Sequence, residues 1–190
     1  MFARMGRSPY AFVMDGGWEK LAPKRVPGTC IHRTFFEDDL WYCCRGFREC
    51  FRRFGSIQAL FASAPDVWEG IALFRETMAA ANGGYSKHIA NPAANSACKR
   101  LHLALRWLVR RDGPVDLGVW EGISPSSLFI PLDLHVGRTA RYIGFLDAGR
   151  QANDRKAVVA LTGKLRELCP EDPVKYDLAL FSYSIQKNIG

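Results

Sequence analysis

Four basic side chains recur at helical spacing within one short stretch of the sequence. Lys99, His102, Arg106 and Arg110 are three, four and four residues apart, which places them on one face of a helix. Cations in such a row repel one another unless acids, water or phosphates screen them. The pattern predicts an exposed face that contacts nucleic-acid phosphates, with an ordinary solvated surface as the alternative.

Lys99 differs from the other three residues because it lies in the first turn of that helix. The helix dipole and the neighbouring arginines disfavour its ammonium form. A neutral lysine amine can attack a sugar or carbonyl carbon and form a Schiff base. Lys99 is therefore a candidate nucleophile, and a simple phosphate contact is the alternative.

Asp133 directly precedes an apolar periodic segment, where an aspartate usually caps a helix. A capping carboxylate is rigidly oriented, so the same residue can also face a cleft. There it could stabilise a developing oxocarbenium ion or activate a nucleophile. His135 and Arg138 follow it closely in the predicted helix. We regard Asp133 as a candidate catalytic carboxylate and retain the simple helix cap as the other interpretation.

Helices are the elements that must position these residues. Apolar side chains recur at three- and four-residue steps in 40–54, 67–78, 97–108, 136–143, 158–168 and 174–185. Within the first of these helices, Arg45, Arg48 and Arg52 line a separate face. Predicted helix caps are Asp66, Asn95 or Ser96, Asp133, Asp154 and Asp172. No run alternates with a period of two, so we expect an all-α fold of seven to nine helices.

Length and charge limit the organisation and the partners of the chain. A chain of 190 residues fits a single helical domain, with N-terminal helices in 8–94 and a hairpin-like helix pair and C-terminal helices in 95–190. Its formal net charge of +7 favours a polyanionic partner. No stretch approaches the roughly 18 apolar residues of a membrane span, and the N-terminus lacks a secretion signal. We therefore expect a cytoplasmic protein without a membrane partner.

Motifs for metals and common cofactors are missing from the sequence. None of the six cysteines forms a C-x-x-C pair, and Cys43, Cys44 and Cys50 fall within one helical pattern that suggests burial. The phosphate-binding, dinucleotide-binding, serine-hydrolase and zinc-protease signatures are also absent. We expect no metal and no cofactor.

The segment 131–136, Pro-Leu-Asp-Leu-His-Val, preceded by a helix that bears Lys99, resembles the helix-hairpin-helix DNA glycosylase superfamily. The resemblance is to enzymes of the endonuclease III and archaeal 8-oxoguanine glycosylase type. This resemblance implies a helical glycosylase-like domain, with Asp133 as the catalytic carboxylate and Lys99 as the Schiff-base lysine. Three features depart from the family. The interval between Lys99 and Asp133 is long, at 133 − 99 = 34 positions. The segment 91–95 stands where the family has a glycine-rich hairpin. The four-cysteine cluster of many members is absent, so we expect no iron–sulfur centre.

A second resemblance extends from about Ser8 to the C-terminus. Segments 32–35, 95–101, 105–107, 130–133 and 171–177 resemble a bacterial family of hypothetical proteins known only as a domain of unknown function. That family implies no activity. Its members carry a helical segment before the equivalent of Ser8, so we expect this chain to lack that N-terminal helix.

Taken together, these features predict a DNA glycosylase that flips a damaged base of duplex DNA into a helical cleft, with abasic-site lyase activity if Lys99 attacks the sugar. In this interpretation Trp107 and Trp120 stack on bases. The predicted DNA contacts are Arg100, Arg106, Arg110, His135 and Arg138. One alternative is a non-catalytic nucleic-acid-binding helical protein, in which Asp133 is only a cap. Another is a helical protein-interaction module whose charge is incidental.

Overall fold

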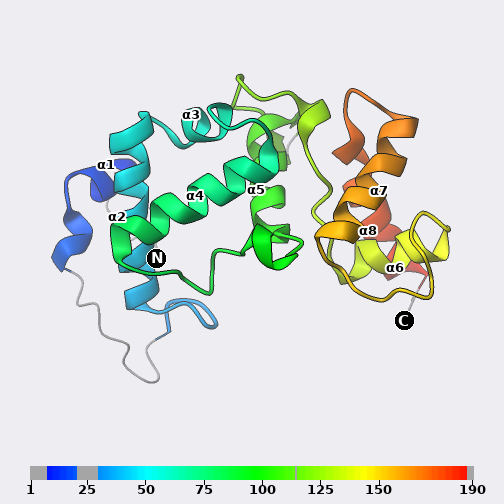
Figure 1. Cartoon of the computed structure of the whole chain (residues 1–190), viewed down its shortest axis with the longest axis horizontal. Coiled ribbons are helices and arrows are strands. Elements are labelled where there is room, and N and C mark those ends of the chain that lie inside the picture. The colour runs from blue at the N-terminus through cyan, green and yellow to red at the C-terminus, as the bar shows by residue number, and fades with distance from the viewer. Residues whose placement is uncertain (1–7, 21–29, 114, 188–190) are drawn as a thin grey trace. The chain divides into compact units, whose positions relative to one another are not determined.

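The computed structural model describes residues 8–20, 30–113 and 115–187 (Figure 1). These residues form eight α-helices, four short 3-10 helices and one pair of two-residue strands. The predicted mainly helical fold is therefore confirmed. The chain divides into two compact units, described separately below: unit 1 is Met1–Ser63 with Leu73–Ile89, and unit 2 is Ala64–Ala72 with Ala90–Gly190. The prediction of one domain over 1–190 stays a prediction.

Unit 1 is built around the long helix α2. Its elements are α1 (Pro9–Met14), η2 (Gly17–Lys20), α2 (Glu37–Phe54), α3 (Ile57–Ala62) and the larger part of α4 (Val67–Asn82). The α2 helix ends as predicted at Gly55, whose φ of 76° suits glycine. Ser8 and Ser56 cap the two short helices α1 and α3, which the periodicity had not predicted. The core cluster of unit 1 contains Val13, Trp18, Leu40 and Cys44.

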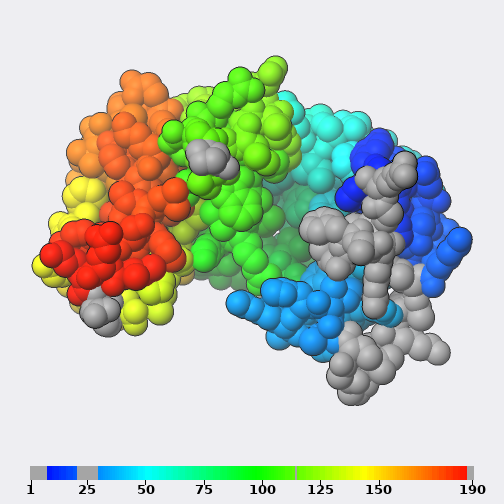
Figure 2. All heavy atoms as spheres, turned by 180° about the vertical axis from the view of Figure 1, so that it is seen from behind, coloured from blue at the N-terminus to red at the C-terminus, as the bar shows by residue number. Residues whose placement is uncertain are grey.

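Unit 2 holds the predicted site residues. Its elements are η3 (Pro92–Ala94), α5 (Lys99–Val109), β1 (Arg111–Asp112), β2 (Asp116–Leu117), η4 (Pro125–Ser127), α6 (Leu134–Tyr142), α7 (Arg155–Leu168), η5 (Pro173–Tyr176) and α8 (Asp177–Gln186). The strands pair antiparallel as a small hairpin, and at two residues each they are too short for an alternating pattern to reveal. The α6 and α8 helices pack against each other. In the space-filling view, the C-terminal segments of this unit, orange and red, form one continuous surface (Figure 2).

A buried, non-helical segment leads to Asp133. Leu128, Ile130 and Leu132 are at most 2% exposed, and the Ile130 N–H donates a hydrogen bond to Thr162 Oγ1 of α7 (3.1 Å). Burying these apolar side chains contributes roughly 1.5–3 kcal/mol each. The segment therefore fixes where α6 begins, and with it the position of Asp133.

Four of the predicted helix caps are confirmed in position, and one prediction is wrong. Asp66, Asp133 and Asp154 each accept a backbone N–H from the first turn of their helices. Asp172 is the N-cap of η5 and is followed by Pro173 as predicted, but it makes no side-chain capping bond and its carboxylate pairs with Arg110. The N-cap of α5 is Cys98, which makes no side-chain capping bond, rather than Asn95 or Ser96. Among the described residues, no helix combines the length and hydrophobicity needed to cross a bilayer.

Candidate active site

Lys99 and Asp133 meet in unit 2 although 34 positions, 133 − 99, separate them in the sequence. Lys99 is the first residue of α5, and Asp133 is the N-cap of α6. The Lys99 Nζ lies 3.1 Å from Asp133 Oδ2, which is an ion-pair distance. The lysine side chain is 44% exposed and the aspartate side chain 16% exposed. An amine and a carboxylate are thus in direct contact, and the amine is accessible from solvent.

Asp133 is held from several directions. Its Oδ1 accepts the Val136 N–H (2.8 Å), so the predicted capping role is confirmed and Oδ2 is left for Lys99. Asn153 Nδ2 donates to the Asp133 backbone carbonyl (3.0 Å). Gly137 makes room for this contact, because a Cβ there would lie 2.5 Å from Asn153 Oδ1. The carboxylate is therefore fixed in orientation before any substrate binds.

The loop that precedes Lys99 is fastened to the same segment. Asn95 and Cys98 adopt left-handed backbone conformations, with φ of 57° and 45°. Asn tolerates this conformation well, whereas it costs about 1–2 kcal/mol at Cys98. The Arg155 N–H donates to the Asn95 carbonyl (3.0 Å), and Asn95 Nδ2 donates to Asp154 Oδ2 (2.7 Å). Residues 153–155 thus anchor both the loop before Lys99 and the backbone at Asp133.

A buried carboxylate, Asp177, adds to the electrostatics of the pair. It is 6% exposed at the start of α8, and burial raises its pKa to about 6. Its closest ionic partner is Arg106, whose Nη1 donates to Asp177 Oδ2 at 2.5 Å and opposes that rise. Asp133 raises the pKa further, while Lys99 lowers it. The Asp172-Pro173 pattern predicts only that a helix begins there and carries no signal for a role of Asp177.

Arg106 and Arg110 do not lie on an exposed face, so the prediction of a solvated cationic row is wrong for both. They are 2% and 3% exposed. Arg106 pairs with Asp116 (3.2 Å) as well as Asp177, and Arg110 pairs with Asp116, Asp172 and Asp112. These carboxylates screen the two guanidiniums, which removes the need for phosphate that motivated the prediction.

His102, predicted on the same exposed row, is 1% exposed. Its ring lies edge-on to Trp68, with centroids 4.6 Å apart, and near Phe129 at 5.8 Å. Neither ring nitrogen has a hydrogen-bond partner among the described residues. Burial, together with Arg155, lowers the pKa of His102 to about 3, so the ring is neutral at pH 7. The buried face of α5 includes this residue, which the leucine pattern did not indicate.

The burial of His102 predicts a specific pH dependence of stability. A histidine with a lowered folded-state pKa binds fewer protons when folded, so its contribution is present above pH 6.5 and is lost as the pH falls from 6.5 toward 3. The wild-type protein should lose up to about 1.4 kcal/mol per pH unit in that range relative to His102→Leu. Urea unfolding of both proteins between about pH 7 and 5 measures the difference. Parallel stability curves would contradict the assignment.

The remaining predicted residues stay closer to the surface. Arg100 is exposed and Arg138 half-buried, and neither makes an ion pair with the described part of the chain. His135 Nδ1 lies 3.3 Å from Ser184 Oγ, and its ring packs edge-on to Phe181. The two tryptophans predicted to stack on bases differ in exposure: Trp107 is 43% exposed, and Trp120 is half-buried. Arg100 and Trp107 are accordingly exposed, whereas Arg138, His135 and Trp120 are half-buried.

Among the described residues, no group of three or more His, Cys, Asp or Glu side chains is placed to hold a metal ion. The Lys99 amine and the Asp133 carboxylate themselves offer proton transfer, nucleophilic attack by the amine, and stabilisation of positive charge.

The profile of a family described as "Protein of unknown function (DUF2400)" matches residues 1–186. No curated protein and no solved structure gives a significant match.

Proposed function

The chain belongs to the family of proteins of unknown function DUF2400, and from the site it carries we propose that it is a DNA glycosylase with abasic-site lyase activity. The observation that supports this proposal is the 3.1 Å contact between the accessible amine of Lys99 and the oriented carboxylate of Asp133. An amine that attacks the sugar carbon, beside a carboxylate that moves protons and stabilises positive charge, can combine glycosylase and lyase chemistry in one site.

The reaction begins with a damaged base flipped out of the duplex. Asp133 Oδ2 takes a proton from the Lys99 ammonium, and the freed electron pair forms an N–C1′ bond. The electron pair of the glycosidic bond leaves with the base, which takes the proton held by Asp133, so the carboxylate is charged again. Asp133 then takes a second proton from the new secondary ammonium and passes it to O4′ as the C1′–O4′ bond of the sugar opens, which gives the protonated Schiff base. Whenever it is deprotonated, the Asp133 carboxylate stabilises the positive charge at C1′ and on the nitrogen.

DNA would be held by cations that remain accessible around this pair. Arg100 follows Lys99 directly in α5, and Arg138 lies in α6, one turn after Asp133. Neither guanidinium is engaged by a carboxylate of the described residues, in contrast to Arg106 and Arg110. We therefore assign phosphate contacts to Arg100 and Arg138 and a structural role to the two buried arginines.

Borohydride trapping tests the proposal. The protein is incubated with duplexes that carry an abasic site, 8-oxoguanine or uracil, and sodium borohydride reduces any Schiff base to a stable amine. We expect an adduct with wild type and none with Lys99→Gln. The matched control is Lys164→Gln, because Lys164 is an exposed lysine in a 3.1 Å pair with Glu167 on α7.

The outcomes separate the alternatives. Loss of the adduct in Lys99→Gln but not in Lys164→Gln supports the lyase. Equal trapping by both variants contradicts a special role for Lys99. If no substrate gives an adduct or a released base, while DNA binding still weakens steeply with salt, the non-catalytic nucleic-acid-binding protein is the correct interpretation.

A further inference from the structure

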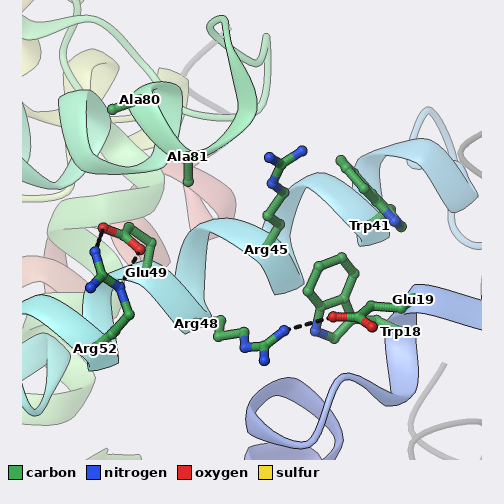
Figure 3. Close-up of a pocket in the computed structure, with 9 residues that line it drawn as sticks. All are labelled: Trp18, Glu19, Trp41, Arg45, Arg48, Glu49, Arg52, Ala80 and Ala81. Carbon is green, nitrogen blue, oxygen red and sulfur yellow. Dashed lines mark hydrogen bonds and ion pairs between the residues drawn. The ribbon is translucent and has the colours of Figure 1, made fainter.

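A hollow of about 770 Å³ lies within unit 1, along one side of α2. It is bounded by Trp18 and Glu19 of η2, by residues of α2, and by Ala80 and Ala81 of α4 (Figure 3). The two alanine side chains are short, so the space beside α2 stays open. This hollow belongs to a different unit from Lys99 and Asp133, and the site proposed above does not use it.

Three arginines of α2 line this hollow. Arg45, Arg48 and Arg52 follow one another at steps of three and four residues, which keeps them on one side of the helix. Seven residues of α-helix span about 10 Å, roughly the rise of three nucleotide steps along one strand of DNA. Figure 3 shows the three guanidiniums pointing in different directions rather than converging on one point. This arrangement suits an elongated polyanion better than a single small anion.

Two of the three arginines are paired with glutamates at the protein surface. Arg48 Nη1 lies 2.7 Å from Glu19 Oε1, with side chains 43% and 58% exposed. Arg52 donates to Glu49 from Nε and Nη2 (2.9 and 2.7 Å), with side chains 70% and 25% exposed. Water screens exposed ion pairs, so a phosphate can compete with the carboxylates for both guanidiniums, most easily at Arg48.

Arg45 makes no ion pair with the described part of the chain. Its guanidinium carbon lies 5.1 Å from the centre of the Trp41 ring. Trp41 packs edge-on against Trp18 (centroids 5.4 Å apart), and Trp18 Nε1 donates to the Val13 carbonyl at 2.9 Å. Among the described residues no carboxylate neutralises Arg45, so this cation, which lies over an anchored aromatic ring, is available to an incoming anion.

We propose that this hollow binds a single DNA strand, with the strand's phosphates on Arg45, Arg48 and Arg52. Three arginines against two glutamates leave a local charge of 3 − 2 = +1 before the strand arrives. Phosphates that replace Glu19 and Glu49 bring all three guanidiniums into the contact. Trp41 supplies an aromatic surface next to the phosphate path, as in other proteins that bind single strands. The inference rests on the proposed function only in naming DNA as the polyanion.

The test is fluorescence anisotropy of the full chain with a fluorescein-labelled oligothymidine of about 15 nucleotides, which carries no lesion. We expect Arg45→Glu to weaken binding at least about 10-fold and Arg45→Ala to reduce the slope of log K against log salt by about 0.7. The matched control is Arg53→Glu, on the same helix and outside the hollow, where Arg53 lies over the Phe54 ring. Arg53→Glu changes the net charge as much as Arg45→Glu does. Because Arg53 lies outside the hollow, we expect it to weaken binding less than about 3-fold.

Two results would overturn the inference. The first is equal weakening of binding by Arg45→Glu and Arg53→Glu. The second is displacement of the oligonucleotide by pyrophosphate at a phosphate concentration equal to that of the oligonucleotide, which would indicate a small-anion site. Because binding is measured without a lesion, its outcome is independent of trapping at Lys99. Binding without catalysis would leave the strand site standing and refute the glycosylase. Catalysis at Lys99, with oligonucleotide binding unaffected by Arg45→Glu, would support the glycosylase and refute the strand site.

Discussion

Replacing Arg106 with alanine is expected to lower the free energy of unfolding by about 3–5 kcal/mol. The guanidinium is 2% exposed and pairs with two carboxylates, Asp116 and Asp177, that are themselves buried. Its removal leaves Asp177 without its ionic partner and Asp116 with Arg110 alone. An uncompensated buried charge costs more than the lost contact, so the effect should exceed that of an ordinary surface substitution. Urea unfolding measures it.

The pH dependence of this loss identifies its cause. Without Arg106, the pKa of Asp177 should rise above its value of about 6, so the folded variant binds a proton that the unfolded chain releases. The loss of stability should therefore be smaller at about pH 5 than at about pH 8. Arg100→Ala, an exposed position on the same helix, should change stability by less than about 0.5 kcal/mol. If Arg106→Ala lowers the free energy of unfolding no more than Arg100→Ala does, the buried network does not stabilise the fold.

Asp133→Asn is expected to reduce release of a damaged base by about 10²- to 10⁴-fold. Asparagine is as good a helix cap as aspartate, so the Val136 N–H stays satisfied and α6 still begins at the same place. The neutral amide, however, cannot take a proton from Lys99 or stabilise positive charge at C1′. The substitution therefore removes the proposed chemistry and preserves the structural role.

Single-turnover release of the damaged base, with protein in excess over duplex, measures this effect. Asp66→Asn is the matched control, because Asp66 caps α4 through the Glu69 N–H (2.9 Å) and lies outside the site. It should leave the rate unchanged. Unchanged release in Asp133→Asn would mean that Asp133 is only a helix cap.

Local signals in the sequence could predict most of the fold. An aspartate before an apolar periodic segment located the starts of α4, α6 and α7, because capping depends on residues within one turn. The short helices α1 and α3 carry only two turns of apolar side chains, which is too little for periodicity to reveal. Cys98 was missed as the N-cap of α5 because its left-handed backbone, unlike a capping side chain, leaves no mark in residue type.

Long-range charge pairing could not be predicted in the same way. Arg106 is buried because Asp116 and Asp177, 10 and 71 residues away, meet it there. The spacing of basic residues along α5 carries no information about those partners, so it indicated an exposed row. The meeting of Lys99 with Asp133 was an expectation from family resemblance, and helical periodicity alone fixes no distance between α5 and α6. Their contact depends on the buried segment 128–132 and on the anchoring by 153–155.

The most direct test of the account is to locate the adduct. Wild-type protein trapped with borohydride on an abasic-site duplex is digested with nuclease and protease, and mass spectrometry identifies the lysine that carries the sugar remnant. The account predicts that the remnant lies on Lys99, whose amine is paired with Asp133 and accessible. A remnant spread over other lysines, or no covalent adduct on any substrate, would contradict it.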